Sequence, residues 1–408
     1  MITPLRVSRS LFPLVPCAVL ATAVSTPLSA RAVAAGPLAA GDLHSLVVEG
    51  DGSVWGWGMG SDGELGPGAP AVQMEPAPVR GVAGVKAVAA GRGFSIALKN
   101  DGTVWAWGDD FSGQLGDGQA KLRSDPRPVA GLTSVVDIAC GAAYVLAIKS
   151  DGTVWAWGSN DYGQLGDGSV TDRSRAVQVQ GLTNVKAVAA GAHHSLALRS
   201  DGTVWSWGKN GDGELGDGTR DDRSLPGRVP SLAGISAVAA GWYTSLALRA
   251  DGTVWGWGGN ATGAVGDGDA TTVLVPTAVV GVTNIKAIAA GNWHCLALTQ
   301  DGKVWAWGNN GTGQIGDGTA LDRQTPILLP GVQGARVIAA GNWHSLAASD
   351  SKTIWAWGNN AVGQLGDGTV NTSNKPVLVG STPPPAAPAI ANAAATVAGA
   401  PVTKPAGQ

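Results

Sequence analysis

Four of the five histidines recur at one position of a fifty-residue repeat, where each directly precedes a serine or a cysteine. A ring of imidazoles could bind a metal, and a His-Ser pair could suggest nucleophilic catalysis. Adjacent residues of a strand face opposite ways, however, so neither pair can act as a dyad. Because other copies carry Phe94, Tyr144 and Thr244 at this position, we interpret the histidines as structural. They are His44, His194, His294 and His344.

Six copies of the repeat carry one carboxylate each in a Gly-Asp-Gly turn, which could suggest calcium binding in an exported protein. Calcium needs six to eight converging oxygens, whereas these side chains belong to separate copies, so we interpret them as turn residues. No nucleophile, base and orienting group emerge together, and we expect neither an enzyme, a cofactor nor a metal site. A hydrolase or lyase stays as a third alternative, which turnover abolished by one carboxylate substitution would establish. The turn residues are Asp117, Asp167, Asp217, Asp267, Asp317 and Asp367.

The element that positions these residues is marked by a Trp-x-Trp tripeptide that recurs at a constant step of fifty residues. A fixed period of this length indicates a solenoid, a propeller or a string of small domains. The residue between the two tryptophans is Gly, Ala or Ser in every copy. The pairs begin at Trp55, Trp105, Trp155, Trp205, Trp255, Trp305 and Trp355.

Each copy predicts four short strands, which in the fourth copy are Val185 to Ala190, Ser195 to Leu198, Thr203 to Trp207 and Pro226 to Val229. An Asp-Gly step marks the tight turn between the second and third strands. Both tryptophans of a pair point to one face of the sheet, and the small residue points to the other. Stacking the bulky face of one sheet on the flat face of the next buries apolar surface. This burial contributes roughly 10 kcal/mol of stabilisation per copy, before opposing terms are subtracted.

We therefore predict an all-β fold, a seven-bladed β-propeller of seven 50-residue repeats with four-stranded antiparallel blades. The first copy offers only Leu38-Ala-Ala40 as its leading strand, and the last copy ends on a further strand at Pro376 to Val379. We expect these two ends to share one sheet and so to close the ring.

The repeated strings Ala-Ala-Gly-x-x-His-Ser-Leu-Ala-Leu, Asp-Gly-Thr-Val-Trp-x-Trp-Gly-x-Asn and Gly-Gln-Leu-Gly-Asp-Gly-Thr closely resemble the repeats of the regulator of chromosome condensation family. The resemblance runs from about Gly36 to Gly380 and implies the propeller fold. The family includes guanine-nucleotide exchange and chromatin-binding proteins, a plant light sensor and secreted bacterial inhibitors of β-lactamases. The constant repeat step leaves no room for an inserted wedge, and there is no basic arm, which argues against exchange activity.

The two ends of the chain differ in composition from the array. Residues 1–34 carry Arg6 and Arg9 before an apolar stretch too short to span a bilayer, which predicts a signal peptide and a secreted or periplasmic protein. Residues 35–380 are the propeller, and residues 381–408 form a Pro/Ala-rich tail without periodicity, which we expect to be disordered. We expect Cys140 and Cys295 to be buried thiols, too far apart for a disulfide. The net charge of -3 indicates neither a basic nucleic-acid footprint nor an acidic tail, and we expect a monomer with no membrane span.

The informative residues are the aromatics that the repeat does not require. They fall in the Gly-x-x-His loop and in the loop after Trp-Gly, which leave the same end of every antiparallel sheet. We expect all of them on one face of the disc, with four residues from three consecutive copies making an apolar patch of about 600 Å². A plug of the central channel by these indoles is the alternative. The eight candidates are Trp242, Tyr243, Trp293, Trp343, Phe94, Tyr144, Phe111 and Tyr162.

The same loops carry many carboxylates and few cations, so phosphate backbones are poor partners and a protein with a neutral or basic surface is favoured. Our first hypothesis is a secreted, non-enzymatic propeller that binds a protein through an aromatic, acidic face. Two alternatives stay open: an inhibitor of a secreted hydrolase such as a β-lactamase, and a carbohydrate-binding module. The acidic residues are Asp42, Asp62, Glu64, Asp109, Asp110, Asp161, Asp212 and Glu214.

Overall fold

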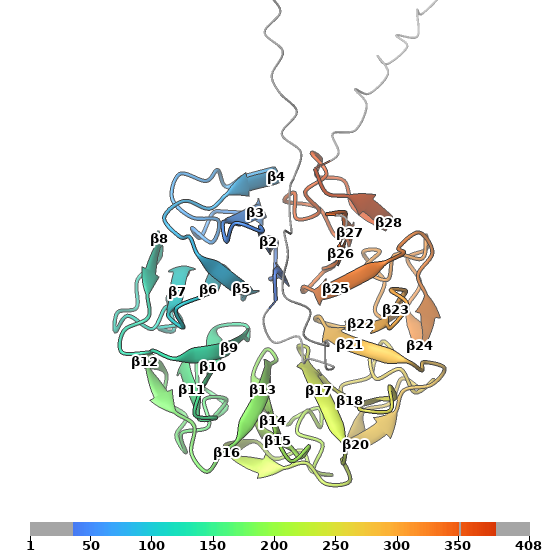
Figure 1. Cartoon of the computed structure of the whole chain (residues 1–408). Coiled ribbons are helices and arrows are strands. Elements are labelled where there is room, and N and C mark those ends of the chain that lie inside the picture. Colours follow the sequence, from blue (N-terminus) through green and yellow to red (C-terminus); the bar gives the residue numbers. More distant parts are fainter. Residues whose placement is uncertain (1–35, 351, 381–408) are drawn as a thin grey trace, which may run out of the picture.

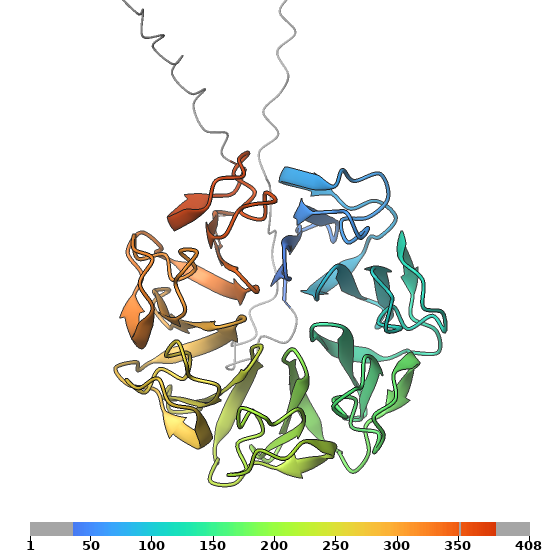
Figure 2. The ribbon, with the colours of Figure 1, turned by 180° about the vertical axis from the view of Figure 1, so that it is seen from behind.

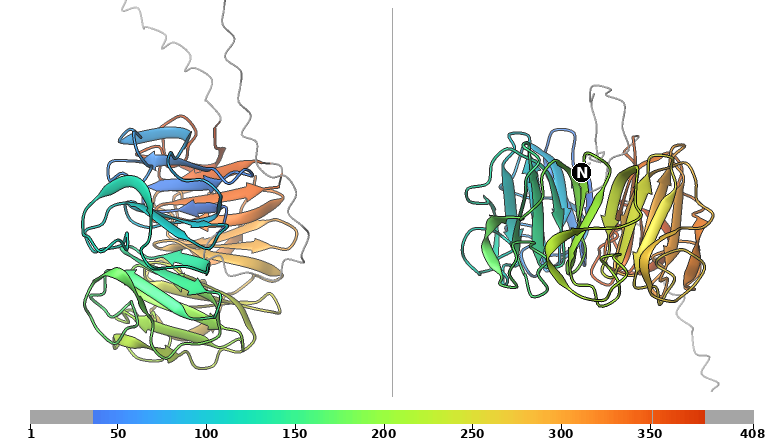
Figure 3. Two further views of the ribbon diagram at one scale, coloured as in Figure 1. Left: turned by 60° about the vertical axis from the view of Figure 1, so that its left-hand side comes forward. Right: turned by 90° about the horizontal axis from the view of Figure 1, so that it is seen from below.

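The computed structural model describes residues 36–350 and 352–380, and these residues form seven four-stranded antiparallel sheets arranged around a central axis (Figure 1). The view from behind and the side views show the sheets standing next to one another as the blades of a disc (Figures 2 and 3). The prediction of an all-β, seven-bladed propeller is confirmed. The predicted signal peptide and the predicted disordered tail lie outside the described residues. The described residues include no helix long and apolar enough to cross a membrane.

Each blade is built from four consecutive strands of one repeat, paired in chain order. The strands are β1 (Leu38–Ala40), β2 (His44–Val48), β3 (Val54–Met59) and β4 (Val72–Pro78); β5 (Val85–Ala90), β6 (Phe94–Lys99), β7 (Val104–Gly108) and β8 (Arg123–Pro128); β9 (Val135–Cys140), β10 (Tyr144–Lys149), β11 (Val154–Gly158) and β12 (Arg173–Gln178); β13 (Val185–Ala190), β14 (His194–Arg199), β15 (Val204–Gly208) and β16 (Arg223–Arg228); β17 (Ile235–Ala240), β18 (Thr244–Arg249), β19 (Val254–Gly258) and β20 (Val273–Ala278); β21 (Ile285–Ala290), β22 (His294–Thr299), β23 (Val304–Gly308) and β24 (Arg323–Leu328); and β25 (Ala335–Ala340), β26 (His344–Ser349), β27 (Ile354–Gly358) and β28 (Ser373–Leu378).

The two tryptophans of each pair have different structural roles. The second is fully buried between two blades, and its indole nitrogen donates a hydrogen bond to a backbone carbonyl of the preceding blade: Trp207 Nε1 lies 2.8 Å from the Gln164 oxygen, and the bond recurs in all seven blades. The first tryptophan is half-buried. The small residue between them faces inward in its own blade, where an added Cβ at Gly56 would lie 3.0 Å from Leu65.

Gly166 illustrates why the loop that carries this acceptor needs glycine. Its φ is +69°, a left-handed conformation that other residues adopt at a cost. A Cβ there would also lie 2.8 Å from the indole nitrogen of Trp207. The last glycine of the repeated Gly-x-Leu-Gly string is therefore required because the neighbouring blade's tryptophan lies against it.

The expectation that the first and last strands share a sheet is wrong. β1 pairs only with β2, and β28 pairs only with β27, so each repeat supplies a complete blade. The ring closes instead through the same contact that joins the other blades, since Trp57 Nε1 donates to the Gln364 oxygen at 2.9 Å. Because the sequence repeat begins with the innermost strand, no strand is left over to exchange between the ends.

Candidate functional site

Two kinds of loop leave one end of every sheet, as the sequence predicted. One joins the first strand of a blade to the second and carries the Gly-x-x motif; the other joins the third strand to the fourth and follows Trp-Gly. We call the surface that they form the loop face. The Asp-Gly hairpins between second and third strands, with the links between blades, form the opposite surface, which we call the turn face.

The four repeated histidines are fully buried beneath the loop face and link neighbouring blades. His194 Nε2 lies 2.9 Å from Ser245 Oγ of the next blade, and that hydroxyl donates to the Glu214 carbonyl oxygen at 2.8 Å. Equivalent pairs join His44, His294 and His344 to serines of their next blades. Burial lowers the pKa of His44 to about 4 and that of the other three to about 3, so all are neutral at physiological pH. Their structural interpretation is confirmed.

The Gly-Asp-Gly carboxylates are also structural. In all six, one side-chain oxygen accepts the backbone N–H two residues later, which closes the turn. Four of them also pair with an arginine at the start of the fourth strand, as Asp167 pairs with Arg173 at 2.7 Å. The described residues contain no group of three or more His, Cys, Asp or Glu side chains placed to hold a metal ion.

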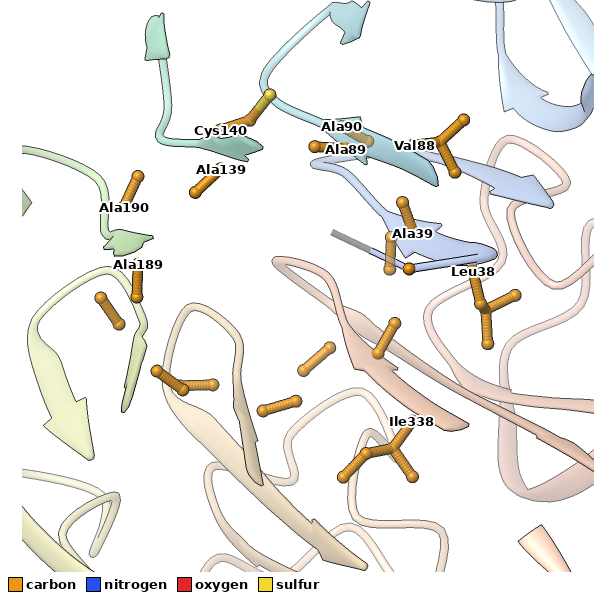
Figure 4. Close-up of a pocket in the computed structure, with 18 residues that line it drawn as sticks. Leu38, Ala39, Val88, Ala89, Ala90, Ala139, Cys140, Ala189, Ala190 and Ile338 are labelled. Atoms are coloured by element: carbon orange, nitrogen blue, oxygen red, sulfur yellow. The ribbon is translucent and has the colours of Figure 1, made fainter. Parts of the chain in front are cut away.

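The innermost strands leave a narrow channel along the axis, lined almost entirely by alanines (Figure 4). Cys140 is a free thiol at this wall and is only half-buried, whereas Cys295 is buried as expected. Seven strands converge here, so only small side chains fit. At the loop-face mouth of the channel the lining changes to glycine backbone with Asp42, Arg92, Trp242 and Asn342. Of the eight candidate aromatics, Trp242 alone lines this mouth, so the described channel is not plugged by several indoles.

For two of the eight candidates, Phe94 and Tyr144, the prediction of a surface position is wrong. Both are 0% exposed because they occupy the buried histidine position at the start of a second strand. The Tyr144 hydroxyl even takes over the histidine's interaction, since it lies 3.0 Å from Ser195 Oγ of the next blade. Neither side chain can contact a partner.

Four other candidates form one connected row of three stacked rings and a fourth joined to them by a lysine, and we call it the aromatic row. Tyr243 stacks on Trp293 with ring centroids 4.4 Å apart, and Trp242 lies 6.3 Å from Tyr243 at an interplanar angle of 19°. Tyr162 extends the row through Lys209, whose ammonium lies 4.8 Å from the Tyr243 ring centroid and 5.8 Å from that of Tyr162. The row thus crosses four consecutive blades. The patch predicted from three consecutive copies comprised Trp242, Tyr243, Trp293 and Trp343, and because all four are half-buried, its exposed area is smaller than the sequence led us to expect.

Two residues of this cluster did not figure among the sequence candidates. His193 tilts against Tyr162 at 5.1 Å, and its pKa is lowered by burial and by the charge of Lys209, so the ring is neutral. Lys209 stands where other copies carry Met, Asp, Ser, Gly or Asn. The signal that could have identified it is therefore the one used for the aromatics, a departure from the repeat at a loop-face position.

The remaining two candidates stay outside the row. Phe111 is 82% exposed, the most accessible of the large apolar side chains described, and it projects from the loop after β7 in the second blade. Trp343 occupies the same repeat position as Trp293 and is half-buried, but no ring of the described chain stacks on it.

The loop face is less acidic than the sequence suggested, because three of its eight carboxylates are buried: Glu64, Asp110 and Glu214. Asp110 accepts the backbone N–H of Leu115, as asparagine does in other blades, and it also accepts that of Lys121. Burial raises the pKa of Asp110 to about 6 and that of Glu64 to about 7. Asp42, Asp62 and Asp109 remain accessible on the first two blades, where Arg92 lies 3.9 Å from Asp42.

Comparison with known proteins supports the repeat resemblance. The model of the RCC1-like domain matches residues 13–280, and models of the regulator of chromosome condensation (RCC1) repeat match residues 285–314 and 336–364, and residues 301–348 and 353–391. No curated protein sequence matches the chain.

Among solved structures, human WBSCR16 is 27% identical, with a TM-score of 0.72 over 80% of this chain and 94% of its own. Prp20p from Saccharomyces cerevisiae, whose binding to Gsp1p and histones has been studied, is 24% identical, with a TM-score of 0.73 over 85% of this chain and 87% of its own. The same yeast protein bound to Kap60 is 23% identical in the aligned region, with a TM-score of 0.74 over 91% of this chain and 92% of its own.

Proposed function

This chain belongs to the RCC1-like family, and from that premise we propose that it is an exported, non-enzymatic propeller that binds a protein partner on its loop face through the aromatic row. The observation that carries the proposal is the stack of Trp242, Tyr243 and Trp293, which Lys209 extends to Tyr162. The rest of the repeat is explained by the scaffold. These residues depart from the repeat, and they gather on one surface.

The geometry of the row suits protein recognition. Tyrosine and tryptophan are enriched among the residues that dominate interface energies, and rings held by their neighbours lose little conformational freedom on binding. Lys209 places a positive charge within the row, whereas Asp62 and Asp109 give the first two blades a negative one. A partner with an apolar contact for the row and a basic group toward these carboxylates complements both regions.

Export is the second part of the proposal and rests on residues 1–34 alone. Arg6 and Arg9 precede the apolar stretch, and small residues around Ala30 to Ala34 offer cleavage sites. N-terminal sequencing of the protein recovered from the culture medium or periplasm tests it directly. A mature chain that begins near Ala35 supports export; an uncleaved chain found only in the cytoplasm contradicts it.

The binding proposal is tested by cross-linking capture from the producing culture, with the parent chain and two single variants as bait. Trp293→Ala removes a ring of the row, so we expect it to weaken binding of the parent's partner at least tenfold, equivalent to a loss of about 1.4 kcal/mol or more. Trp343→Ala removes the same residue type from the same repeat position, one blade away and outside the row, and should retain capture. Equal capture by the three proteins, each shown to be folded by circular dichroism, would return the row to a purely structural role.

A further inference from the structure

The first tryptophan of each pair faces the turn face, where in four blades a cation covers its ring. The Lys99 ammonium lies 4.8 Å from the Trp105 centroid, and the other covered pairs are Lys149 on Trp155, Arg199 on Trp205 and Arg249 on Trp255. In the second, third and fourth blades the indole nitrogen also lies 3.3 Å from a threonine hydroxyl two residues earlier, to which it donates. In these three blades, the ring face and the N–H of the first tryptophan are therefore both occupied within the chain.

The sixth blade departs from this arrangement at both positions. Thr299 replaces the cation and Lys303 replaces the threonine, a combination found in no other copy. The Thr299 hydroxyl contacts the Asp301 carboxylate, and the Lys303 ammonium lies 2.8 Å from Asp301 Oδ2. Within residues 36–350 and 352–380, no cation covers the Trp305 ring, and no side chain accepts its N–H. Two independent changes thus leave the half-buried Trp305 indole without a covering cation and without a side-chain acceptor.

A surface hollow opens against this indole. It is lined by Trp305 and Leu328 on the apolar side, and its polar side includes Asn284, Gln300, Asp301 and Lys303. Asp301 and Lys303 are more than half exposed, and Gln300 is exposed. The fourth blade shares the loop residues Thr183 and Asn184 at the positions of Thr283 and Asn284, yet there the tryptophan is covered by Arg199. The cation over the tryptophan ring, rather than the loop, distinguishes the fourth blade from the sixth.

We propose that this hollow binds a pyranose sugar, stacked on Trp305. The C–H face of a pyranose is flat and apolar and matches an indole face that no cation covers, whereas its ring hydroxyls both donate and accept hydrogen bonds. The Asp301 carboxylate accepts such bonds, and the Lys303 ammonium and the amides of Asn284 and Gln300 donate them. Asp301 is the single carboxylate of the lining and is paired with Lys303, so the site is suited to binding and not to glycoside cleavage, which uses two carboxyl groups.

The sugar site is independent of the proposed protein-binding function because it lies on the turn face, on the side of the disc opposite the aromatic row. A partner and a glycan can therefore be held at the same time. Such an arrangement would place the ring on a polysaccharide surface with its loop face directed outward.

The test is a titration of the full chain, labelled with ¹⁵N in its tryptophan indoles, followed by NMR. Methyl glycosides of glucose, galactose, mannose and N-acetylglucosamine are added one at a time to about 50 mM, well above the millimolar dissociation constant expected for one stacked ring. The Trp305 resonance is assigned from a Trp305→Phe spectrum. We expect at least one glycoside to shift it saturably while the Trp205 resonance stays in place. No shift with any glycoside, or equal shifts of all indoles, would overturn the proposal.

Two matched variants connect the effect to the uncovered indole. Thr299→Lys with Lys303→Thr rebuilds the pair found in the second blade and should abolish the saturable shift without loss of folding. Arg199→Thr with Thr203→Lys uncovers Trp205 above the same Thr-Asn loop and should make that indole respond to the same glycoside. Undiminished binding by the first variant would show that the cover is not what controls the site and would contradict the inference.

Discussion

Replacing Trp207 by alanine is expected to lower the free energy of unfolding by about 4 kcal/mol, the middle of the range for loss of a buried aromatic side chain. Trp207 is 0% exposed and packs with Leu146 and Leu165 of the third blade and Val188 and Ala197 of the fourth. The substitution therefore opens a cavity between two blades. It also removes the donor to the Gln164 oxygen, which keeps its second hydrogen bond from Ser195. Denaturant unfolding followed by circular dichroism measures the loss.

The matched control is Trp205→Ala in the same strand. Trp205 is half-buried on the turn face and donates only a long bond within its own blade, so we expect a loss of about 1 to 2 kcal/mol. A ring in which each repeat contacts only its neighbours depends on every interface. If the two variants proved equally stable, the second tryptophans would not be the residues that hold blade to blade.

Acid destabilisation is the second large effect. Four histidines have folded pKa values of about 3 to 4, below the value of about 6.5 in an unfolded chain. Because the unfolded state binds their protons first, stability is full above pH 6.5 and falls as the pH drops toward the folded values. Between pH 6.5 and 5 each histidine costs about 2 kcal/mol. Glu64 and Asp110, whose folded pKa values are raised, oppose this loss because they are protonated in the folded state first.

A single substitution isolates one histidine from these opposing groups. His294→Phe places in the sixth blade the residue that the second blade carries as Phe94, so the site accommodates it. We expect the mean slope of unfolding free energy against pH between 5 and 6.5 to fall by about 1.1 kcal/mol per pH unit, because the unfolded imidazole passes from half to almost full protonation over this range. Ser345→Ala removes the partner of the same imidazole, 2.8 Å away, but keeps its proton site. Ser345→Ala should lower the free energy of unfolding at every pH and leave most of its slope against pH. If that slope were unchanged in His294→Phe, the buried histidine would not be the cause of the acid destabilisation.

The period, the four strands of each copy and the face that each loop joins could all be predicted, because they depend on glycine turns and on side-chain alternation within one repeat. The way in which the ring of blades closes could not be predicted from one repeat. The expectation that β1 and β28 share a sheet assumed that one end lacked a strand, whereas the inter-blade bonds of Trp57 and Gln364 close the ring without exchange. That bond joins residues 307 positions apart, and no local pattern specifies it.

The candidate site was predicted in part, for a similar reason. Departure from the repeat correctly placed Trp242, Tyr243, Trp293 and Tyr162 on one face, yet it gave no measure of burial. Phe94 and Tyr144 depart from the repeat just as clearly, but they fill a buried position where histidine, phenylalanine and tyrosine all fit. Glu64, Asp110 and Glu214 were likewise counted as surface charges, although their side chains bond the backbone beneath the loops. Burial in both cases depends on the neighbouring blade.

We expect a protein partner to occupy the aromatic row, and hydrogen exchange of the free and the partner-bound ring measures this occupancy directly. The partner is the protein captured by the parent chain and confirmed to bind it in purified form. We expect slowed exchange in the loop-face segments 159–163, 209–213, 241–243 and 291–293, with little change in the hairpins 149–153, 199–203 and 249–253 of the turn face. Protection confined to the turn face, or to the fourth strands at the rim, would show that the row is not where the partner binds.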